Sequence, residues 1–142
     1  MFLVDTNVIS EARKGDRADP GVIAFWSEAA LQNTPIFLAS VTLGELRRGV
    51  ALIRRRGDQP QAALLEQWLD QVLLDYSDRI LALDGDAAQI WGCLRVPDPN
   101  NAIDKQIAAI ALLHDLTLVT RNTADFKRTG VRLLNPFQLT PP

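Results

Sequence analysis

The sequence predicts an α/β fold with a central parallel sheet of about five strands. Two observations support this prediction: short apolar runs recur along the chain, and segments with helical periodicity separate them. Strands that alternate with helices are joined by right-handed crossovers, so the strands run parallel and helices cover both faces of the sheet. Apolar residues make up 47% of the chain and charged residues 23%, which is typical of a globular protein.

Each expected strand is an apolar run about four residues long. Such runs are typical of strands that are buried on both faces. The expected strands cover residues 1–4, 36–39, 80–83, 117–120 and 131–134.

Helical spacing of apolar residues fills most of the chain between these runs. The sequence predicts helices over 8–12, 21–32, 40–54, a segment that begins at Pro60, 87–94 and 101–113. Basic residues followed by Gly15 and by Gly57 are typical of helix C-termini, and Pro60 suits a first helical turn. We expect the segments on either side of Gly57 to form a helical hairpin, and the tail to Pro142 to lie on the surface as a strap. No repeat or linker divides the chain, so we expect a single domain over residues 1–142.

Composition limits the possible functions and locations. The formal net charge is −2, so the chain as a whole does not attract nucleic acid. The single cysteine, Cys93, suits a reducing cytosol, and residues 2–4 are too short for the apolar part of a secretory signal. No stretch reaches the roughly 20 apolar residues of a membrane span. We therefore expect a cytoplasmic protein.

Polar side chains recur where a strand or loop gives way to a helix. Asp5 follows the first strand, Glu45 and Asp104 lie in expected first helical turns, and Asn122 and Asp125 follow the fourth strand. If the first and fourth strands are neighbours, all these groups meet in one crevice at the carboxyl end of the sheet, where ligands bind in open parallel sheets.

A purely structural interpretation of three of these acids is also available. Residues 42–45 read as a capping box, and residues 101–104 and 122–125 have the same spacing. Acidic residues in a first turn also complement the helix dipole. Glu45, Asp104 and Asp125 are each as easily explained by capping as by function, whereas Asp5 at the end of a buried strand is not.

Carboxylates that share a crevice raise one another's pKa unless a cation lies among them. Oxygen ligands of this kind suit Mg²⁺ or Mn²⁺. His114 is the only histidine and lies at the far end of the helix that contains Asp104, so a histidine base is not expected. These observations favour a metal-dependent phosphodiesterase that uses metal-activated water.

Four motifs in order resemble PIN-domain ribonucleases, specifically the VapC-type toxins of type II toxin–antitoxin pairs, close to their FitB-like branch. The motifs are VDTN at 4–7, TLGELRRG at 42–49, DKQIAA at 104–109 and TRNTADF at 120–126. The resemblance implies a PIN-like three-layer α/β/α sandwich with strand order 3-2-1-4-5, and a metal-dependent endoribonuclease that acts as a toxin.

The resemblance also implies roles for individual residues. Asp5 and Asp104 would bind the metal directly, and Glu45 would reach it through water. Many relatives have an aspartate just after the fourth strand, where this chain has Asn122, so Asn122 or Asp125 would fill the fourth position. The hydroxyls of Thr6 and Thr120 would orient a carboxylate or a water.

The substrate would be RNA, and the basic residues beside the acidic motifs are candidates for binding its phosphates: Arg47, Arg48, Lys105 and Arg121. The resemblance further implies inhibition by a small antitoxin with a DNA-binding N-terminus, whose tail folds into an apolar groove. We expect that groove beside the helical hairpin, and we expect a homodimer.

Alternative functions remain at this stage. A PIN nuclease that is not a toxin and a catalytically weak PIN interaction module share most of these features. A phosphatase of the haloacid dehalogenase type also has an aspartate after its first strand, but it needs a second aspartate where this chain has Asn7. The sequence identifies neither the RNA nor the number of metals.

Overall fold

The computed structural model describes residues 1–138 of the chain. Its centre is a sheet of five parallel strands in the order β3-β2-β1-β4-β5, so the strand order implied by the resemblance is confirmed. The strands are β1 (Phe2–Val4), β2 (Ile36–Ala39), β3 (Ile80–Leu81), β4 (Thr117–Val119) and β5 (Leu133–Leu134).

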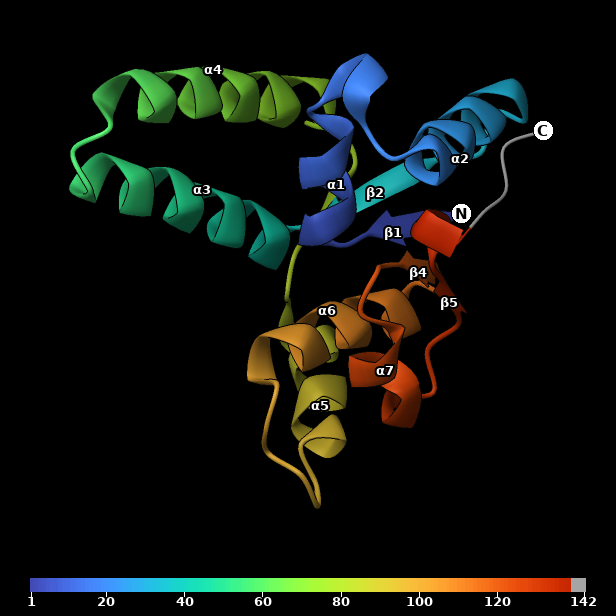
Figure 1. Cartoon of the computed structure of the whole chain (residues 1–142). Helices are drawn as coiled ribbons and strands as arrows, with labels where there is room; N and C mark the ends of the chain where they lie inside the picture. The colour runs from blue at the N-terminus through green and yellow to red at the C-terminus, as the bar shows by residue number, and fades with distance from the viewer. Residues whose placement is uncertain (139–142) are drawn as a thin grey trace.

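Helices cover both faces of this sheet, which confirms the three-layer arrangement. Helices α1 to α4 lie on one side, and α5 to α7 lie on the other (Figure 1). The α-helices are α1 (Thr6–Ala12), α2 (Pro20–Leu31), α3 (Ser40–Arg55), α4 (Gln59–Asp75), α5 (Gly85–Leu94), α6 (Ala102–Leu113) and α7 (Thr123–Phe126). Three short 3₁₀ helices are η1 (Gly15–Arg17), η2 (Lys127–Thr129) and η3 (Pro136–Gln138).

Alternate residues of the central strands enter opposite layers of the core. Val4 and Val119 pack in the cluster beneath α1 to α4, while Leu3 and Leu118 pack in the cluster beneath α5 and α6. All four side chains are fully buried. Burial of a Leu or Val side chain contributes roughly 1.5–3 kcal/mol, so this short stretch of β1 and β4 contributes much of the stability of the fold. It also explains why these strands read as continuous apolar runs.

The two edge strands are shorter than predicted. Strand β3 has two residues instead of the four expected over 80–83, and β5 has two instead of the four expected over 131–134. Each edge strand pairs with a neighbour on one side only, and its residues are half-buried. No helix was predicted after the fourth strand, but α7 lies there and is anchored by the fully buried Phe126. One helical turn is too short to show periodicity in the sequence.

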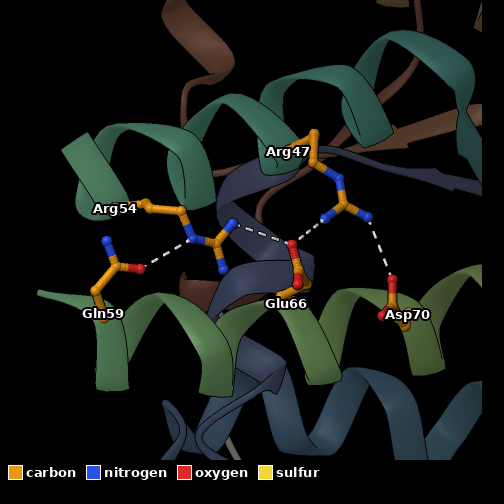
Figure 2. Close-up of polar contacts among 5 residues, drawn as sticks. All are labelled: Arg47, Arg54, Gln59, Glu66 and Asp70. Atoms are coloured by element: carbon orange, nitrogen blue, oxygen red, sulfur yellow. Dashed lines mark hydrogen bonds and ion pairs between the residues drawn. The ribbon is translucent and has the colours of Figure 1, made fainter.

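Helices α3 and α4 form the predicted hairpin, which extends away from the rest of the molecule (Figure 1). Gly57 in the connection has a φ of +91°, a conformation that favours glycine. Figure 2 shows the ion pairs that join the two helices. Glu66 accepts from Arg47 at 3.1 Å and from Arg54 at 3.2 Å, and Arg47 also bonds Asp70 at 3.2 Å. These residues are partly exposed, so each pair contributes on the order of 0.2–1 kcal/mol.

The described chain ends with η3, which packs beside α2. The expected surface strap reaches Pro142, so its last four residues lie outside the described part of the chain. Within residues 1–138, the helices are too short or too polar to cross a membrane.

Candidate active site

Asp5 lies where β1 ends and α1 begins, at the centre of the sheet. Its backbone amide donates to the carbonyl of Val119 on the neighbouring β4 at 2.9 Å. Its side chain is 4% exposed and accepts two short hydrogen bonds. The Thr6 backbone N–H donates to Oδ1 at 2.8 Å, and the Thr120 hydroxyl donates to Oδ2 at 2.8 Å. Asp5 is thus both the cap of α1 and a buried carboxylate with a fixed orientation.

The Thr120 hydroxyl uses its full hydrogen-bonding capacity. It donates to Asp5 and accepts from Asn7 Nδ2 at 3.3 Å and from the Asn122 backbone N–H at 3.0 Å. A hydroxyl has one donor and two acceptor positions, so its rotation is fixed. Asn7 also links the ends of β1 and β4. Its Nδ2 donates to Asp5 Oδ2 at 3.4 Å, and its Oδ1 accepts from the Arg121 backbone N–H at 3.1 Å. The ends of β1 and β4 are therefore held together by side chains as well as by the sheet.

Three acids, Asp5, Asp125 and Glu45, act electrostatically on Asp104. Asp104 lies in the first turn of α6, and its pKa is raised to about 6 by burial first and then by the charges of Asp5, Asp125 and Glu45. The structure therefore brings together the four acidic residues that the sequence singled out, although they come from four separate parts of the chain.

The pKa of Asp5 is also raised. Burial is the largest cause, and the charge of Asp125 adds to it. The hydrogen bonds from Thr120 and from the Thr6 amide oppose these effects. In the acid cluster of Asp5, Glu45, Asp104 and Asp125, burial and repulsion therefore disfavour the charged forms of Asp5 and Asp104.

This acid cluster matches the donor chemistry of a hard divalent cation. Among the described residues, no three Asp, Glu, His or Cys side chains already form a ligand cage. Mg²⁺ does not require such a cage, since it binds through one or two carboxylates and keeps several waters. Hard oxygen donors, together with a raised pKa caused partly by neighbouring carboxylates, fit Mg²⁺ or Mn²⁺ at Asp104 and Asp5.

The capping interpretation of these acids is wrong in its details. Helix α3 begins at Ser40, so Glu45 lies in its second turn and not in the first. The Thr42 hydroxyl is buried without a hydrogen-bond partner in the described structure, so residues 42–45 do not form a capping box. Asn101 and Asn122 both precede helices but make no side-chain capping bond. Side-chain capping therefore does not explain these carboxylates, although Asp104 and Asp125 do lie in first helical turns, where an acid complements the helix dipole.

The fourth position of the site contains both predicted candidates. Asn122 and Asp125 are exposed, and the backbone of Asn122 is held by the Thr120 hydroxyl. The charge of Asp125 raises the pKa of both Asp5 and Asp104. Asp125 therefore supplies the negative charge at this position. Thr6 contributes its backbone amide to Asp5, whereas its hydroxyl was predicted to have this role.

The basic residues expected to hold RNA phosphates have different surroundings. Arg47 is engaged by Glu66 and Asp70 on α4 (Figure 2). Lys105 is only 7% exposed, and its ammonium bonds the Asp98 backbone carbonyl and lies 3.7 Å from the Asp98 carboxylate. The geometry does not support RNA contacts by Arg47 and Lys105, because both are already paired.

The remaining two basic candidates are exposed. The guanidinium of Arg121 lies 3.8 Å from the centre of the Phe137 ring, and Arg48 is on the surface of α3. Sequence analysis missed the part that Asn7 plays in orienting Asp5. The signal was an amide side chain two residues after the aspartate, where Asn commonly bonds the turn it belongs to.

A PIN domain family model matches residues 2–131, which include the whole acid cluster. The chain is 34% identical to Toxin FitB of Neisseria gonorrhoeae (strain ATCC 700825 / FA 1090) over 143 residues, covering 96% of this chain and 99% of that protein. It is 31% identical to VapC ribonuclease Y4jK of Sinorhizobium fredii (strain NBRC 101917 / NGR234), covering 97% of this chain and 99% of that protein.

Solved structures show the same similarity. The crystal structure of FitAcB from Neisseria gonorrhoeae matches 98% of this chain and 100% of that chain with a TM-score of 0.83 and 34% identity. The structure of FitAB bound to an IR36 DNA fragment matches 99% of this chain and 98% of that chain with a TM-score of 0.82 and 32% identity. The chain belongs to the PIN domain family, in the branch that contains FitB and the VapC proteins.

Proposed function

We propose that this chain is a metal-dependent endoribonuclease and the toxin of a type II toxin–antitoxin pair. The observation that carries the proposal is the acid cluster, in which the charges of Asp5, Glu45 and Asp125 raise the pKa of Asp104. The relatives support the activity, since one is named a VapC ribonuclease and another a toxin.

Each residue of the site has a proposed task. Asp5 and Asp104 hold Mg²⁺ or Mn²⁺, Glu45 acts through water, and Asp125 or Asn122 completes the site. When bound, the metal lowers the pKa of an attacking water and polarises the phosphoryl group. Thr120 keeps the Asp5 carboxylate in one orientation, because both its donor and its acceptor positions are occupied.

The described structure favours metal-activated water over a histidine base. His114 is the C-cap of α6, whereas Asp104 is in the first turn of the same helix. Ten residues of helix separate them by about 15 Å. Asn7 occupies the position at which a haloacid dehalogenase phosphatase needs its general acid, and its amide is engaged with Asp5 and Thr120.

The proposal is tested by RNA cleavage with and without metal. We expect cleavage in Mg²⁺ or Mn²⁺ with 5′-phosphate and 3′-hydroxyl ends, and no cleavage in excess EDTA. Asp5→Asn and Asp104→Asn should each abolish cleavage and stay folded. Asp86→Asn is the matched control, since Asp86 is an exposed first-turn acid on α5 and should keep full activity. Products with 2′,3′-cyclic phosphates, or activity in EDTA, would exclude the proposed chemistry.

Metal binding provides a second test that does not depend on activity. Mg²⁺ should raise the melting temperature of the wild-type chain and of Asp86→Asn more than that of Asp5→Asn or Asp104→Asn, because a ligand stabilises only the form that binds it. Equal shifts in all four proteins would remove Asp5 and Asp104 from the metal site.

The proposed antitoxin contact is an apolar cavity of about 430 Å³ between α1, α2 and α4. Val22, Ile23 and Trp26 of α2 face Trp68 and Val72 of α4 across it. The expected groove beside the α3–α4 hairpin therefore includes α2 as well, and it uses only the α4 side of the hairpin. A disordered tail that folds on binding can bury its apolar side chains in such a cavity.

A further inference from the structure

A second cavity, of about 350 Å³, adjoins the acid cluster on the side of α7. It lies between the segment that follows α5, the start of α6, and the α7–η2 turn, and it shares Asp125 with the acid cluster. Its volume lies within the roughly 300–1,000 Å³ of ordinary ligand pockets. The charged and amide side chains that line it are Asp98, Asn101, Lys105, Asp125, Lys127 and Arg128.

Two of the lining residues, Lys105 and Asp98, neutralise each other's charge. Lys105 is buried, and its ammonium is held by the backbone carbonyl and the carboxylate of Asp98. The pKa of Asp98 is lowered by a backbone hydrogen bond from Asn100 first, and also by the charges of Lys105 and Arg128. Asp98 therefore stays ionised and satisfies Lys105, so that neither is required to bind a ligand.

Two further cations that line the cavity are not paired in this way. Lys127 and Arg128 are exposed on η2, and within residues 1–138 neither makes an ion pair or a side-chain hydrogen bond. The residues that flank them anchor the turn, because Phe126 is fully buried and its carbonyl accepts from the Thr129 hydroxyl at 2.6 Å. The burial of Phe126 and its bond with Thr129 thus fix the backbone that carries both cations beside the cavity.

The position of these cations offsets the repulsion between the acid cluster and an approaching polyanion. A polyanion that approaches Asp5, Asp104 and Asp125 meets like charges, which repel it. Lys127 and Arg128 follow Asp125 by two and three residues and line the same cavity. Three cations and two carboxylates line this cavity, so its lining is positive even though the chain has a net charge of −2.

We propose that this cavity binds a phosphate of the RNA strand next to the phosphodiester that is cleaved, with Lys127 and Arg128 as its ligands. This inference rests on the proposed ribonuclease function, and it names cations that were not singled out in the sequence. Arg128 can offer two parallel N–H donors to one phosphate, while Lys127 acts as a point charge.

The first experiment measures binding without cleavage. Fluorescence anisotropy with a labelled single-stranded RNA dodecamer of random sequence is measured in an Asp104→Asn background and in Mg²⁺, so that the RNA remains intact. Adding Lys127→Ala and Arg128→Ala together should raise Kd at least about tenfold. It should also reduce the slope of log Kd against log salt by about 0.7, since one phosphate contact to a single strand is lost.

Two further variants control for charge alone. Arg55→Ala with Arg56→Ala removes the same charge from exposed residues at the end of α3 remote from Glu45, and should change Kd less than about twofold. Lys127→Arg should keep wild-type affinity. If the Lys127/Arg128 double variant binds RNA as well as the Arg55/Arg56 control, with unchanged melting temperatures, the cavity is not a phosphate site.

The second experiment separates this inference from the proposed function. In the active chain, the Lys127/Arg128 double variant should raise KM for RNA about tenfold and change kcat less than about threefold. A fall in kcat without a change in KM would overturn the proposed binding role. If no protein cleaves RNA, the ribonuclease proposal fails, while the anisotropy result still decides whether the cavity holds RNA.

Discussion

The pKa of Asp104 gives the residue-level prediction with the clearest sign. The pKa in the folded chain is about 6, compared with the ordinary 3.8, so the folded state binds a proton that the unfolded state has already lost between these values. Without metal, the free energy of unfolding therefore falls as the pH rises from about 4 to 6. Above about pH 6, Asp104 causes no further loss of stability.

Replacing Asp104 by Asn removes this penalty. In EDTA at pH 7.5, Asp104→Asn should be more stable than the wild-type chain by about 1–3 kcal/mol, since one pKa unit corresponds to about 1.4 kcal/mol. The difference should approach zero near pH 4. Urea unfolding at both values of pH measures it. Asp86 lies outside the acid cluster, so the free energy of unfolding of Asp86→Asn should stay within about 1 kcal/mol of the wild-type value at both values of pH. A gain that persists at pH 4 would mean that charge repulsion is not its cause.

The Thr120 hydroxyl is the second residue on which the site depends. Thr120→Val keeps the volume but leaves Asp5 without its 2.8 Å hydrogen bond, which should cost about 1.5–3 kcal/mol because the acceptor is charged and buried. RNA cleavage should fall at least about tenfold. Thr120→Ser retains the hydroxyl and should keep most of the activity. Full activity in Thr120→Val would show that the orientation of Asp5 does not depend on this bond.

The site residues were easier to predict than their contacts. Asp5 could be singled out because it follows an apolar run, and Asp104 because it lies in the first turn of a predicted helix. The contact of Asn7 with Asp5 had a local signal, but its contact with Thr120 could not be predicted, because Thr120 is more than a hundred residues away. Lys105 looked like an RNA ligand next to Asp104, yet its side chain is buried against Asp98. Sequence spacing gives the position of a charge and not the direction in which a long side chain points.

At the scale of elements, the α3–α4 hairpin changes what Arg47 is expected to do. Because Arg47 is paired with Glu66 and Asp70, Arg47→Ala should change the stability by less than about 1 kcal/mol and the RNA affinity by less than about twofold. Arg48→Ala, at the neighbouring exposed position, should weaken RNA binding more. Anisotropy and thermal melting measure both effects. A large loss of RNA affinity in Arg47→Ala would mean that these ion pairs open to bind substrate.

Element boundaries followed from the sequence where burial is complete. The strand over 36–39 was predicted with its observed bounds, because β2 is largely buried and paired on both sides. The edge strands β3 and β5 were predicted too long, because residues such as Ala82 and Val131 are apolar but have no ladder partner. The start of α3 at Ser40 was predicted correctly, but the interpretation of residues 42–45 as a capping box placed Glu45 one turn too early.

For the whole molecule, we predict a homodimer that a smaller partner inhibits. Alone, the chain should have about twice the 15.7 kDa of one copy by light scattering. Co-expressed with the protein encoded next to it, the chain should co-purify with that protein and lose RNA cleavage. A monomeric mass would remove the dimer, and undiminished cleavage in a tight complex would remove the toxin assignment.

The apolar cavity allows this partner contact to be tested separately. Ile23→Asp places a charge in the cavity lining on α2 and should weaken partner binding at least about tenfold while leaving RNA cleavage unchanged. Leu31→Asp is the control on the same helix, since Leu31 is 79% exposed and lies outside the cavity lining. Equal partner binding by both variants would place the contact elsewhere.

The sheet order has a consequence for how the protein is made. Strand β1 is central, and one of its two neighbours, β4, is among the last elements to leave the ribosome. A nascent chain that ends before residue 120 lacks the hydroxyl that orients Asp5, and it also lacks Asp125. At about 5–20 residues per second, synthesis leaves the chain without its complete site for on the order of ten seconds. A chain with this topology therefore cannot assemble its acid cluster until translation is almost complete.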